Sequence, residues 1–131
     1  MKRIAAIAAV LCLLLSACAG RKTYTLTLPQ AEDLTAITLE RDGAHCTLDR
    51  QADMAALLHL LEGRTTRQES IQDAPVGAEE LVTIELEHRQ PSGQSVLFAY
   101  KKKGGYCLEQ PYNGIYEISE EDYAALTDGL S

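Results

Sequence analysis

The sequence lacks every short motif that commonly marks a catalytic or nucleotide-binding site. No GxSxG, HExxH or CxxC segment and no phosphate-binding loop occurs in its 131 residues. The three histidines are His45, His59 and His88, and none has a second ligand at a spacing that suits a metal ion. We therefore expect a protein that is not an enzyme and that uses neither a metal nor a cofactor.

Basic residues are also scarce. The chain carries 12 Lys and Arg against 19 Asp and Glu, a formal charge of −7 at pH 7. Removal of residues 1–17 with a signal peptide would leave 10 basic and 19 acidic side chains, a formal charge of −9. Such a surface repels phosphate groups, so a nucleic-acid partner is not expected. The apolar fraction of 46% is typical of a folded chain, and the length allows one domain and a targeting segment.

No apolar run is long enough to cross a membrane, and the longest lies at the N-terminus. Two basic residues precede twelve apolar ones, Ile4 to Leu15, whereas a spanning helix needs about 20. The run leads into the tetrapeptide LSAC, residues 15–18, which resembles the bacterial lipobox. The resemblance implies that residues 1–17 are a lipoprotein signal peptide and that Cys18 carries diacylglycerol. An ordinary secretory signal with an incidental cysteine is the alternative.

This interpretation divides the chain into three parts. Residues 1–17 are removed, residues 18–23 form a lipidated membrane tether, and residues 24–131 form one extracytoplasmic domain. Two acyl chains on Cys18 suffice for stable anchoring where one does not. We therefore expect the domain to sit on the outer face of the cell membrane.

The domain is predicted to have an α+β fold with an antiparallel sheet. Tyr24 to Leu28 alternates in polarity and predicts a first strand. Asp42-Gly43 is typical of a two-residue hairpin turn. This turn sets Leu39 opposite Cys46 on the apolar side, which makes Cys46 a core residue.

A helix is expected after the hairpin. Asp49 is a suitable N-cap, and Gly63 is a suitable left-handed stop after about Glu62. Four apolar side chains recur at helical spacing and predict one buried stripe: Met54, Leu57, Leu58 and Leu61.

The second half predicts a four-stranded meander and a C-terminal helix. Residues 81–88 alternate cleanly, with Val82 and its alternate neighbours inward, and residues 95–101 place Val96, Phe98 and Tyr100 on one face. The stretch from Tyr100 to Ile118 holds four of the six tyrosines and two turn signals, and Ser119 is a suitable helix N-cap. Between the helix and the meander, residues 64–78 predict an extended edge segment and then a loop.

Cys46 and Cys107 are the two thiols that remain besides Cys18 after processing. Outside the cytoplasm an even pair suggests a disulfide. Strand alternation, however, puts Cys107 on the face opposite Tyr106 and Leu108, whereas Cys46 faces inward. This favours two unpaired, partly buried thiols, with the disulfide as the open alternative.

Two candidate contact sites follow from exposed turns. Tyr112 lies in a Pro-Tyr-Asn-Gly turn, and with Asn113 and Glu109 it forms a candidate binding site for a protein, peptide or wall polymer. The only basic cluster sits at a predicted hairpin tip and is a candidate membrane contact: Lys101, Lys102 and Lys103. The structural alternative for the tyrosine is that its ring fills the core. The structural alternative for the lysines is that they keep the edge of the sheet soluble.

Four segments resemble a family of small lipoproteins, a domain of unknown function from Gram-positive anaerobic bacteria of the Clostridia type. They are residues 28–33, 37–39, 96–100 and 109–116, the last reading EQPYNGIY. The resemblance covers nearly all of the mature chain and implies no activity. We expect a non-catalytic binding or sensing module on the membrane. A structural lipoprotein that stabilises a membrane protein complex, or an enzyme of undetected type, is the alternative.

Overall fold

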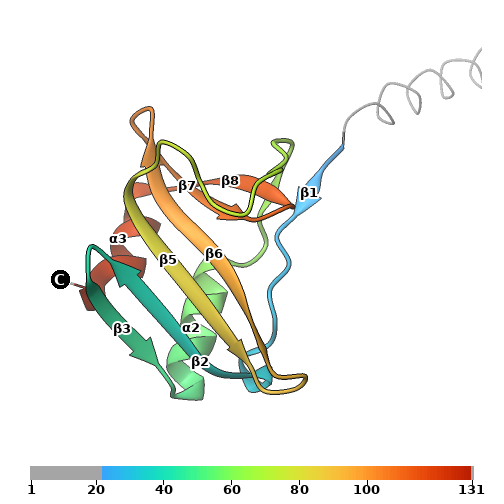
Figure 1. The fold of residues 1–131 in the computed structure, drawn as a ribbon, viewed down its shortest axis with the longest axis vertical. Coiled ribbons are helices and arrows are strands. Elements are labelled where there is room, and N and C mark those ends of the chain that lie inside the picture. Colours follow the sequence, from blue (N-terminus) through green and yellow to red (C-terminus); the bar gives the residue numbers. More distant parts are fainter. Residues whose placement is uncertain (1–21, 131) are drawn as a thin grey trace, which may run out of the picture.

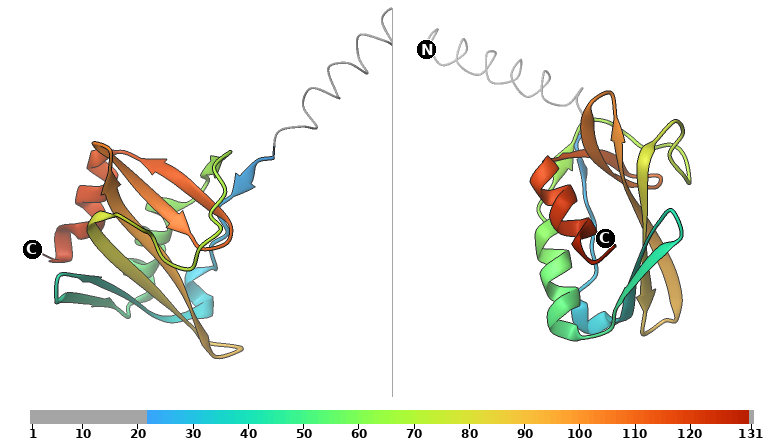
Figure 2. Two further views of the ribbon diagram at one scale, coloured as in Figure 1. Left: turned by 45° about the horizontal axis from the view of Figure 1, so that its top comes forward. Right: turned by 90° about the vertical axis from the view of Figure 1, so that its left-hand side faces the viewer.

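The structure is a computed structural model, and it describes residues 22–130 of the chain. A six-stranded antiparallel sheet is covered by helices on one face, here called the inner face (Figures 1 and 2). The strand order is β3-β2-β5-β6-β7-β8. The strands are β2 Leu34–Arg41, β3 Ala44–Leu48, β5 Glu79–His88, β6 Gly93–Lys102, β7 Gly105–Gln110 and β8 Gly114–Ile118. The helices are α2 Gln51–Leu61 and α3 Glu120–Thr127, with short 3-10 turns η1 Ala31–Asp33 and η2 Asp128–Leu130.

The predicted α+β fold is confirmed. The hairpin β2–β3 is followed by α2, the four-stranded meander β5–β6–β7–β8 and the C-terminal α3. None of the helices in residues 22–130 is long and apolar enough to span a membrane. The predicted signal peptide and Cys18 lie outside the described residues.

The first hairpin has the predicted register. Leu39 pairs with Cys46, and the turn residues Asp42 and Gly43 have φ values of 51° and 84°, as a type I′ turn requires. Cys46 is nevertheless only half-buried, so its assignment to the core was too strong. The reason is that β3 is the last strand of the sheet, and its inner face is covered only in part.

Helix α2 buries the predicted stripe, but its N-terminus differs from the prediction. Met54, Leu57, Leu58 and Leu61 are all buried. The N-cap is Arg50, which has an extended backbone (φ −84°, ψ 135°). The predicted N-cap, Asp49, therefore lies one residue before the true one. No side chain accepts a hydrogen bond from the backbone at the start of this helix. The predicted C-terminal stop is confirmed, because Gly63 has a φ of 79°. In α3, Ser119 Oγ accepts the backbone N–H of Asp122 at 3.0 Å, which confirms that cap.

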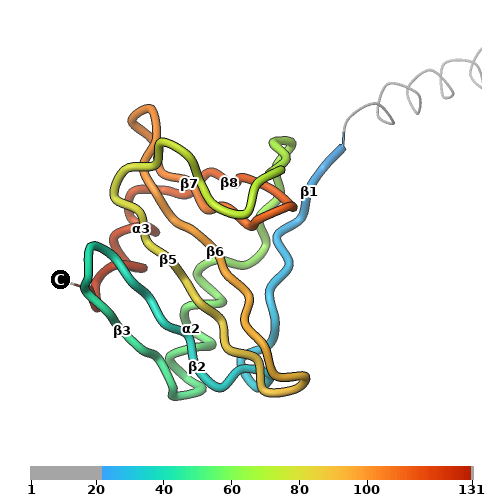
Figure 3. The backbone as a smooth tube through the Cα atoms, in the orientation of Figure 1, coloured from blue at the N-terminus to red at the C-terminus, as the bar shows by residue number. Residues whose placement is uncertain are grey.

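The N-terminal strand is shorter than predicted and lies outside the main sheet. Only Tyr24–Thr25 forms β1, which pairs with β4, Thr65–Thr66. The following residues run along one side of the domain to η1 at its opposite end (Figure 3). They are held there by Gln110, whose side-chain amide accepts the backbone N–H of Thr27 at 3.0 Å and donates to its carbonyl at 2.8 Å.

The main core lies between the inner face of the sheet and the helices. Val82, Ile84 and Leu86 point inward as predicted. On β6 the inward residues are Leu97 and Ala99. Phe98 and Tyr100 share the outer face, as their alternation predicts, yet they too are buried.

Candidate functional site

A long loop covers part of the outer face of the sheet. This covering loop, residues 67–78, connects β4 to β5 (Figures 1 and 2). Its first residues lie beside the start of β8, where the backbone N–H of Ile115 donates to Gln68 O at 2.9 Å and that of Ser70 donates to Asn113 O at 3.1 Å. The loop explains why aromatic side chains on the outer face are buried.

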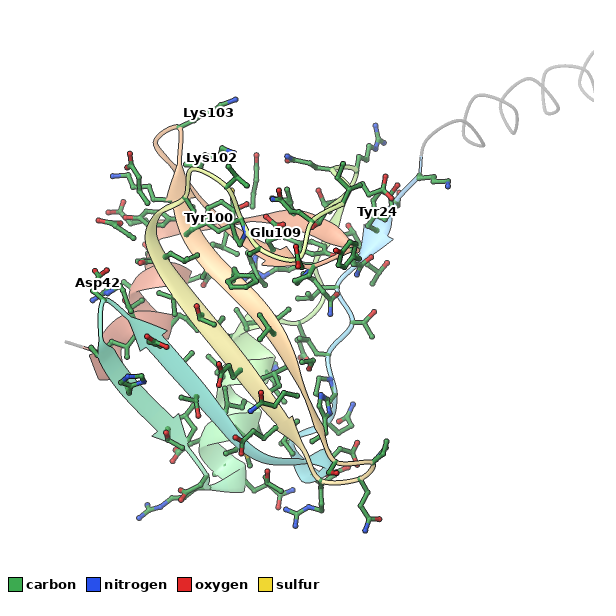
Figure 4. All side chains as sticks on the ribbon, viewed as in Figure 1. Tyr24, Asp42, Tyr100, Lys102, Lys103 and Glu109 are labelled. Atoms are coloured by element: carbon green, nitrogen blue, oxygen red, sulfur yellow. The ribbon has the colours of Figure 1, made fainter. Side chains whose placement is uncertain are left out.

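Glu109 on β7 is the only acidic residue among the buried side chains of the described chain, and its exposed fraction is 0%. Ser70 Oγ donates to its carboxylate at 2.8 Å, and Tyr100 OH donates at 2.8 Å. Gln72 Nε2 lies 3.1 Å from Oε2 and 3.4 Å from Oε1. Figure 4 shows Tyr100 beside Glu109 beneath the covering loop. Strand β6 and the loop thus both bond to this one side chain.

All the donors to Glu109 are neutral groups. The ion pairs formed within residues 22–130 are His59 with Glu62 and Arg64 with Asp122, so no cation lies against Glu109. A buried carboxylate is tolerated only when hydrogen bonds replace the lost water. Burial, and then the hydrogen bond to Glu109, raises the pKa of the Tyr100 hydroxyl well above its ordinary value of 10.0, which keeps it a proton donor. The cluster of Glu109, Ser70, Gln72 and Tyr100 therefore fastens the loop to the sheet.

A small cavity of about 210 Å³ opens beside this cluster. It is lined by Gln68, Gln72, Tyr100, Lys102, Lys103, Cys107 and Ile115. Burial first, and then the charge of Glu117, raises the pKa of the Cys107 thiol, so the thiol is protonated at neutral pH and is a poor nucleophile. Cys107 and Cys46 are both free and half-buried. We see no arrangement of nucleophile and base among the residues that line this cavity.

Tyr112 occupies an exposed turn, as predicted. The residue with a positive φ in this turn is Tyr112 itself, with a value of 59°. The Asn113 N–H donates to Gln110 O at 3.0 Å, so Pro111 and Tyr112 occupy the central positions of a type II turn. The Tyr112 ring is 69% exposed. Gly114 is needed instead for close approach, since a Cβ there would lie 2.8 Å from Thr66 Cγ2.

The other two predicted contact residues support the turn. The side-chain amide of Asn113 donates to Thr25 O at 2.8 Å, to Gln110 Oε1 at 2.7 Å and to Tyr116 OH at 3.1 Å. Glu109 is fully buried and faces the covering loop, so it does not reach the surface. Of the predicted binding set, only Tyr112 presents its side chain to solvent.

The predicted lysine cluster lies at the tip of the β6–β7 hairpin (Figure 4). Lys103 and Gly104 form its two-residue turn, with φ values of 53° and 80°. Lys101 Nζ lies 5.9 Å from the centre of the Tyr106 ring, and Lys102 Nζ donates to Val76 O in the covering loop at 3.3 Å. Lys103 is the member of the cluster whose charge points freely to solvent.

The roles of Ser70 and Gln72 were missed from the sequence. They lie in a polar stretch that carries no periodic pattern, and they meet Glu109 only through the path of the loop. A signal was present on the sheet itself, because Phe98, Tyr100, Cys107 and Glu109 all alternate onto the face opposite the apolar residues Leu97, Ala99 and Leu108. Large aromatic side chains on such a face indicate that another segment covers it.

No group of three or more potential metal-ligating side chains occurs in the part of the chain that the structure describes.

The comparisons with known proteins identify the family but no activity. No curated protein matches the chain. A solved structure described as the NMR structure of the protein from Ruminococcus gnavus is 32% identical, with a TM-score of 0.64, and the match covers 75% of this chain and 98% of that chain. The family model DUF5301, described as a domain of unknown function (DUF5300), matches residues 22–117. These residues are well over half of the sequence and include the covering loop, Glu109 and the Tyr112 turn, and the chain therefore belongs to the DUF5301 family.

Proposed function

We propose that this protein is a lipid-anchored extracytoplasmic module that binds a protein or peptide partner without catalysis. The observation that carries the proposal is the Tyr112 side chain, held 69% exposed on a backbone with a φ of 59°. A bulky residue in the left-handed region costs of the order of 1–3 kcal/mol, and such strain is concentrated at functional sites. Glycine would remove this strain, so a requirement for the ring accounts for the tyrosine.

The turn is built to hold this conformation. Asn113 bonds β1, Gln110 and Tyr116 at once, and Ser70 bonds the Asn113 carbonyl. An exposed aromatic ring on a braced backbone binds a partner with little loss of conformational entropy. Tyrosine is also among the residues that most often anchor interfaces.

Two further apolar side chains lie near this turn or on the loop attached to it. Large exposed hydrophobic side chains of residues 22–130 occur at Ile71, Val76 and Tyr112, with exposed fractions of 78%, 71% and 69%. Ile71 follows Ser70, whose N–H bonds Asn113, so it lies next to the Tyr112 turn. Val76 lies at the other end of β7, where its carbonyl accepts a hydrogen bond from Lys102 Nζ. Ile71 and Tyr112, the exposed apolar surface, favour a protein or peptide with apolar side chains over a wall polymer rich in hydroxyl groups.

The anchoring half of the proposal rests on the sequence, with support from the shape of the domain. The described chain begins beside the Tyr112 turn, at the upper end of the domain in Figure 1, and the β6–β7 hairpin tip lies across the domain at that end (Figures 1 and 2). A lipid on Cys18 would bring this end to the membrane, where each lysine near an anionic surface contributes about 1 kcal/mol. Lys101, Lys102 and Lys103 are then the residues that approach the headgroups.

Replacement of Cys18 tests the anchor. We expect Cys18→Ala to abolish labelling by a radioactive fatty acid and to leave an unprocessed precursor, because no other cysteine lies at the cleavage boundary. Cys12→Ala is the matched control and should be labelled and processed normally. Labelled Cys18→Ala protein would rule out the lipoprotein assignment.

Photo-crosslinking tests the binding surface. Benzoylphenylalanine at position 112 should give one discrete crosslinked product in intact cells, and the additional change Ile71→Ser should reduce it. The same photoreactive residue at position 59, on an exposed part of α2, is the control and should not give that product. Absence of any product at position 112, or the same product at position 59, would contradict the proposal. An integral membrane protein as the crosslinked partner would favour the alternative of a structural lipoprotein.

A further inference from the structure

The Tyr112 turn is hydrogen-bonded to the segment that leads back toward Cys18. Asn113 Nδ2 donates to Thr25 O at 2.8 Å. The side-chain amide of Gln110 accepts the N–H of Thr27 at 3.0 Å and donates to its carbonyl at 2.8 Å. In Figure 1, β1 ends beside the connection between β7 and β8. The exposed tyrosine ring therefore lies close to the place where the chain enters the domain.

That place is fixed by contacts to the rest of the domain. Leu26 is buried in the main core, and its N–H donates to Arg64 O at 2.9 Å. β1 also pairs with β4. The point where the N-terminal segment leaves the domain thus keeps a constant position relative to Tyr112.

The length of the tether limits how far this point lies from the membrane. Thr25 follows Cys18 by seven residues, and seven residues span at most about 25 Å. With a lipid on Cys18, the Tyr112 turn lies within roughly 30 Å of the bilayer surface, since one hydrogen bond separates it from Thr25. The exposed apolar surface therefore opens onto the layer directly above the membrane.

The small size of this surface also bears on the partner. It has two large exposed side chains, Ile71 and Tyr112, whereas stable interfaces between freely diffusing proteins bury about 1,200–2,000 Å² in total. A contact with two apolar anchors is weak by itself. Confinement of both proteins to one membrane raises their effective concentration, so that a weak contact is occupied.

We propose that the partner of Ile71 and Tyr112 is a protein held at the same membrane by a lipid or a transmembrane segment. The partner is bound through a part of its surface that lies within roughly 30 Å of the bilayer. This partner class rests on the proposed function, because it needs both the lipid on Cys18 and the binding role of Tyr112. A partner at the membrane is compatible with a binding module and with a structural lipoprotein.

The bilayer itself is a poorer occupant of this surface. Ile71 lies between Glu69 and Asp73, each two residues away, and both are exposed. Neither forms an ion pair within the described part of the chain, with Arg67 or with any other residue. Insertion of Ile71 among acyl chains would draw two carboxylates out of water, which is costly without compensating bonds. A protein surface can supply those bonds.

A cleavable tether tests whether the partner is held at the membrane. The full chain carries benzoylphenylalanine at position 112 and a protease site in place of residues 19–23, and intact cells are irradiated. After digestion of the wall and cutting of the tether, the uncrosslinked domain should leave the membranes and serves as the internal control. The crosslinked product should remain with the membranes.

The outcomes separate this proposal from the proposed function. Release of the crosslinked product together with the free domain would show a partner that is not membrane-held and would overturn the proposal. A product whose added mass is a phospholipid would overturn it as well, because the bilayer would then occupy the surface. The absence of any product at position 112 would instead refute the binding role of Tyr112 itself.

Anchoring from the other terminus tests the orientation. The C-terminal η2 lies against β3, since a Cβ on Gly129 would lie 2.9 Å from Cys46 Sγ, and β3 and β8 are the two ends of the sheet. Five strand spacings of about 4.8 Å separate these ends, roughly 24 Å. A chain with Cys18→Ser, an ordinary secretory signal and a transmembrane helix fused after Ser131 remains at the membrane but turns Tyr112 away. The yield at position 112 should fall about tenfold at an unchanged melting temperature. An unchanged yield would overturn the location next to the bilayer.

Discussion

Leu108 and Glu109 are neighbours on β7, and both have an exposed fraction of 0%, yet they are buried by different means. Leu108 faces inward among the apolar side chains beneath the helices. Glu109 faces outward and is covered by a loop that hydrogen-bonds to it. One strand therefore borders two interiors, one held by apolar packing and the other by polar bonds to a single carboxylate.

The two interiors differ in how they tolerate change. Apolar packing needs volume and shape, and conservative exchanges within it are usually mild. A polar cluster needs each donor to keep its acceptor, so the loss of one member leaves others unsatisfied. The covering loop, which also carries Ile71 and Val76, is thus expected to be the more easily detached part of the domain.

Leu108→Ala should have one of the largest effects on stability. Truncation of a buried leucine costs about 2–5 kcal/mol, because transfer energy is lost and a cavity remains. Urea denaturation followed by circular dichroism measures the change. A loss below about 1 kcal/mol would show that the inner face is not the main source of stability.

Glu109→Ala should have the next largest effect and act more locally. It removes the acceptor of the Ser70 and Tyr100 hydroxyls and of the Gln72 amide, and unsatisfied buried donors cost about 1–3 kcal/mol. The rate of proteolytic cleavage within residues 67–78 should increase by more than the increase in global unfolding alone would cause. Glu117→Ala, on an exposed neighbouring position, should change stability by less than about 0.5 kcal/mol. Equal effects of the two variants would contradict the role of Glu109.

Tyr100→Phe removes one donor and should cost about 1 kcal/mol at pH 7. It should also change the stability at high pH. The pKa of Tyr100 is raised in the folded state by burial and by Glu109, so the stability tied to its proton is present below the unfolded pKa of 10.0 and is lost as the pH rises above it. Unfolding free energies from pH 9 to 12 should therefore fall less steeply in Tyr100→Phe than in the wild type. Parallel slopes would show that the hydroxyl is not held protonated by the fold.

Tyr112→Ala should have the smallest effect on stability, within about 0.5 kcal/mol, because its ring is exposed and alanine keeps the strained backbone. Tyr100→Ala is the matched comparison and should cost roughly 3–5 kcal/mol, as truncations of buried aromatic residues do. Thermal melts of the two variants separate an exposed tyrosine from a buried one. A large drop for Tyr112→Ala would assign that ring to the fold and remove it as a binding residue.

Local patterns predicted most of the architecture. Asp42-Gly43 determined the register of the first hairpin, the 3.6-residue spacing from Met54 to Leu61 identified the buried face of α2, and Ser119 marked the start of α3. The errors were local as well. Asp49 precedes the N-cap by one residue, and the strand at Tyr24 is only two residues long. Boundaries shift in this way because tertiary contacts select among nearby helix and strand ends.

The sequence by itself determined the fold class, the strand phases and the exposure of Tyr112, because turn chemistry and side-chain alternation act between residues close along the chain. Only the tertiary structure decided what covers the outer face. Ser70 and Glu109 are 39 residues apart and Asn113 and Thr25 are 88 apart, and no local pattern encodes either bond. Alternation assigns a side chain to one face of a strand but does not specify what packs against that face. For Glu109 the difference is between a carboxylate in water and one buried beneath a loop, and the path of the loop decides it.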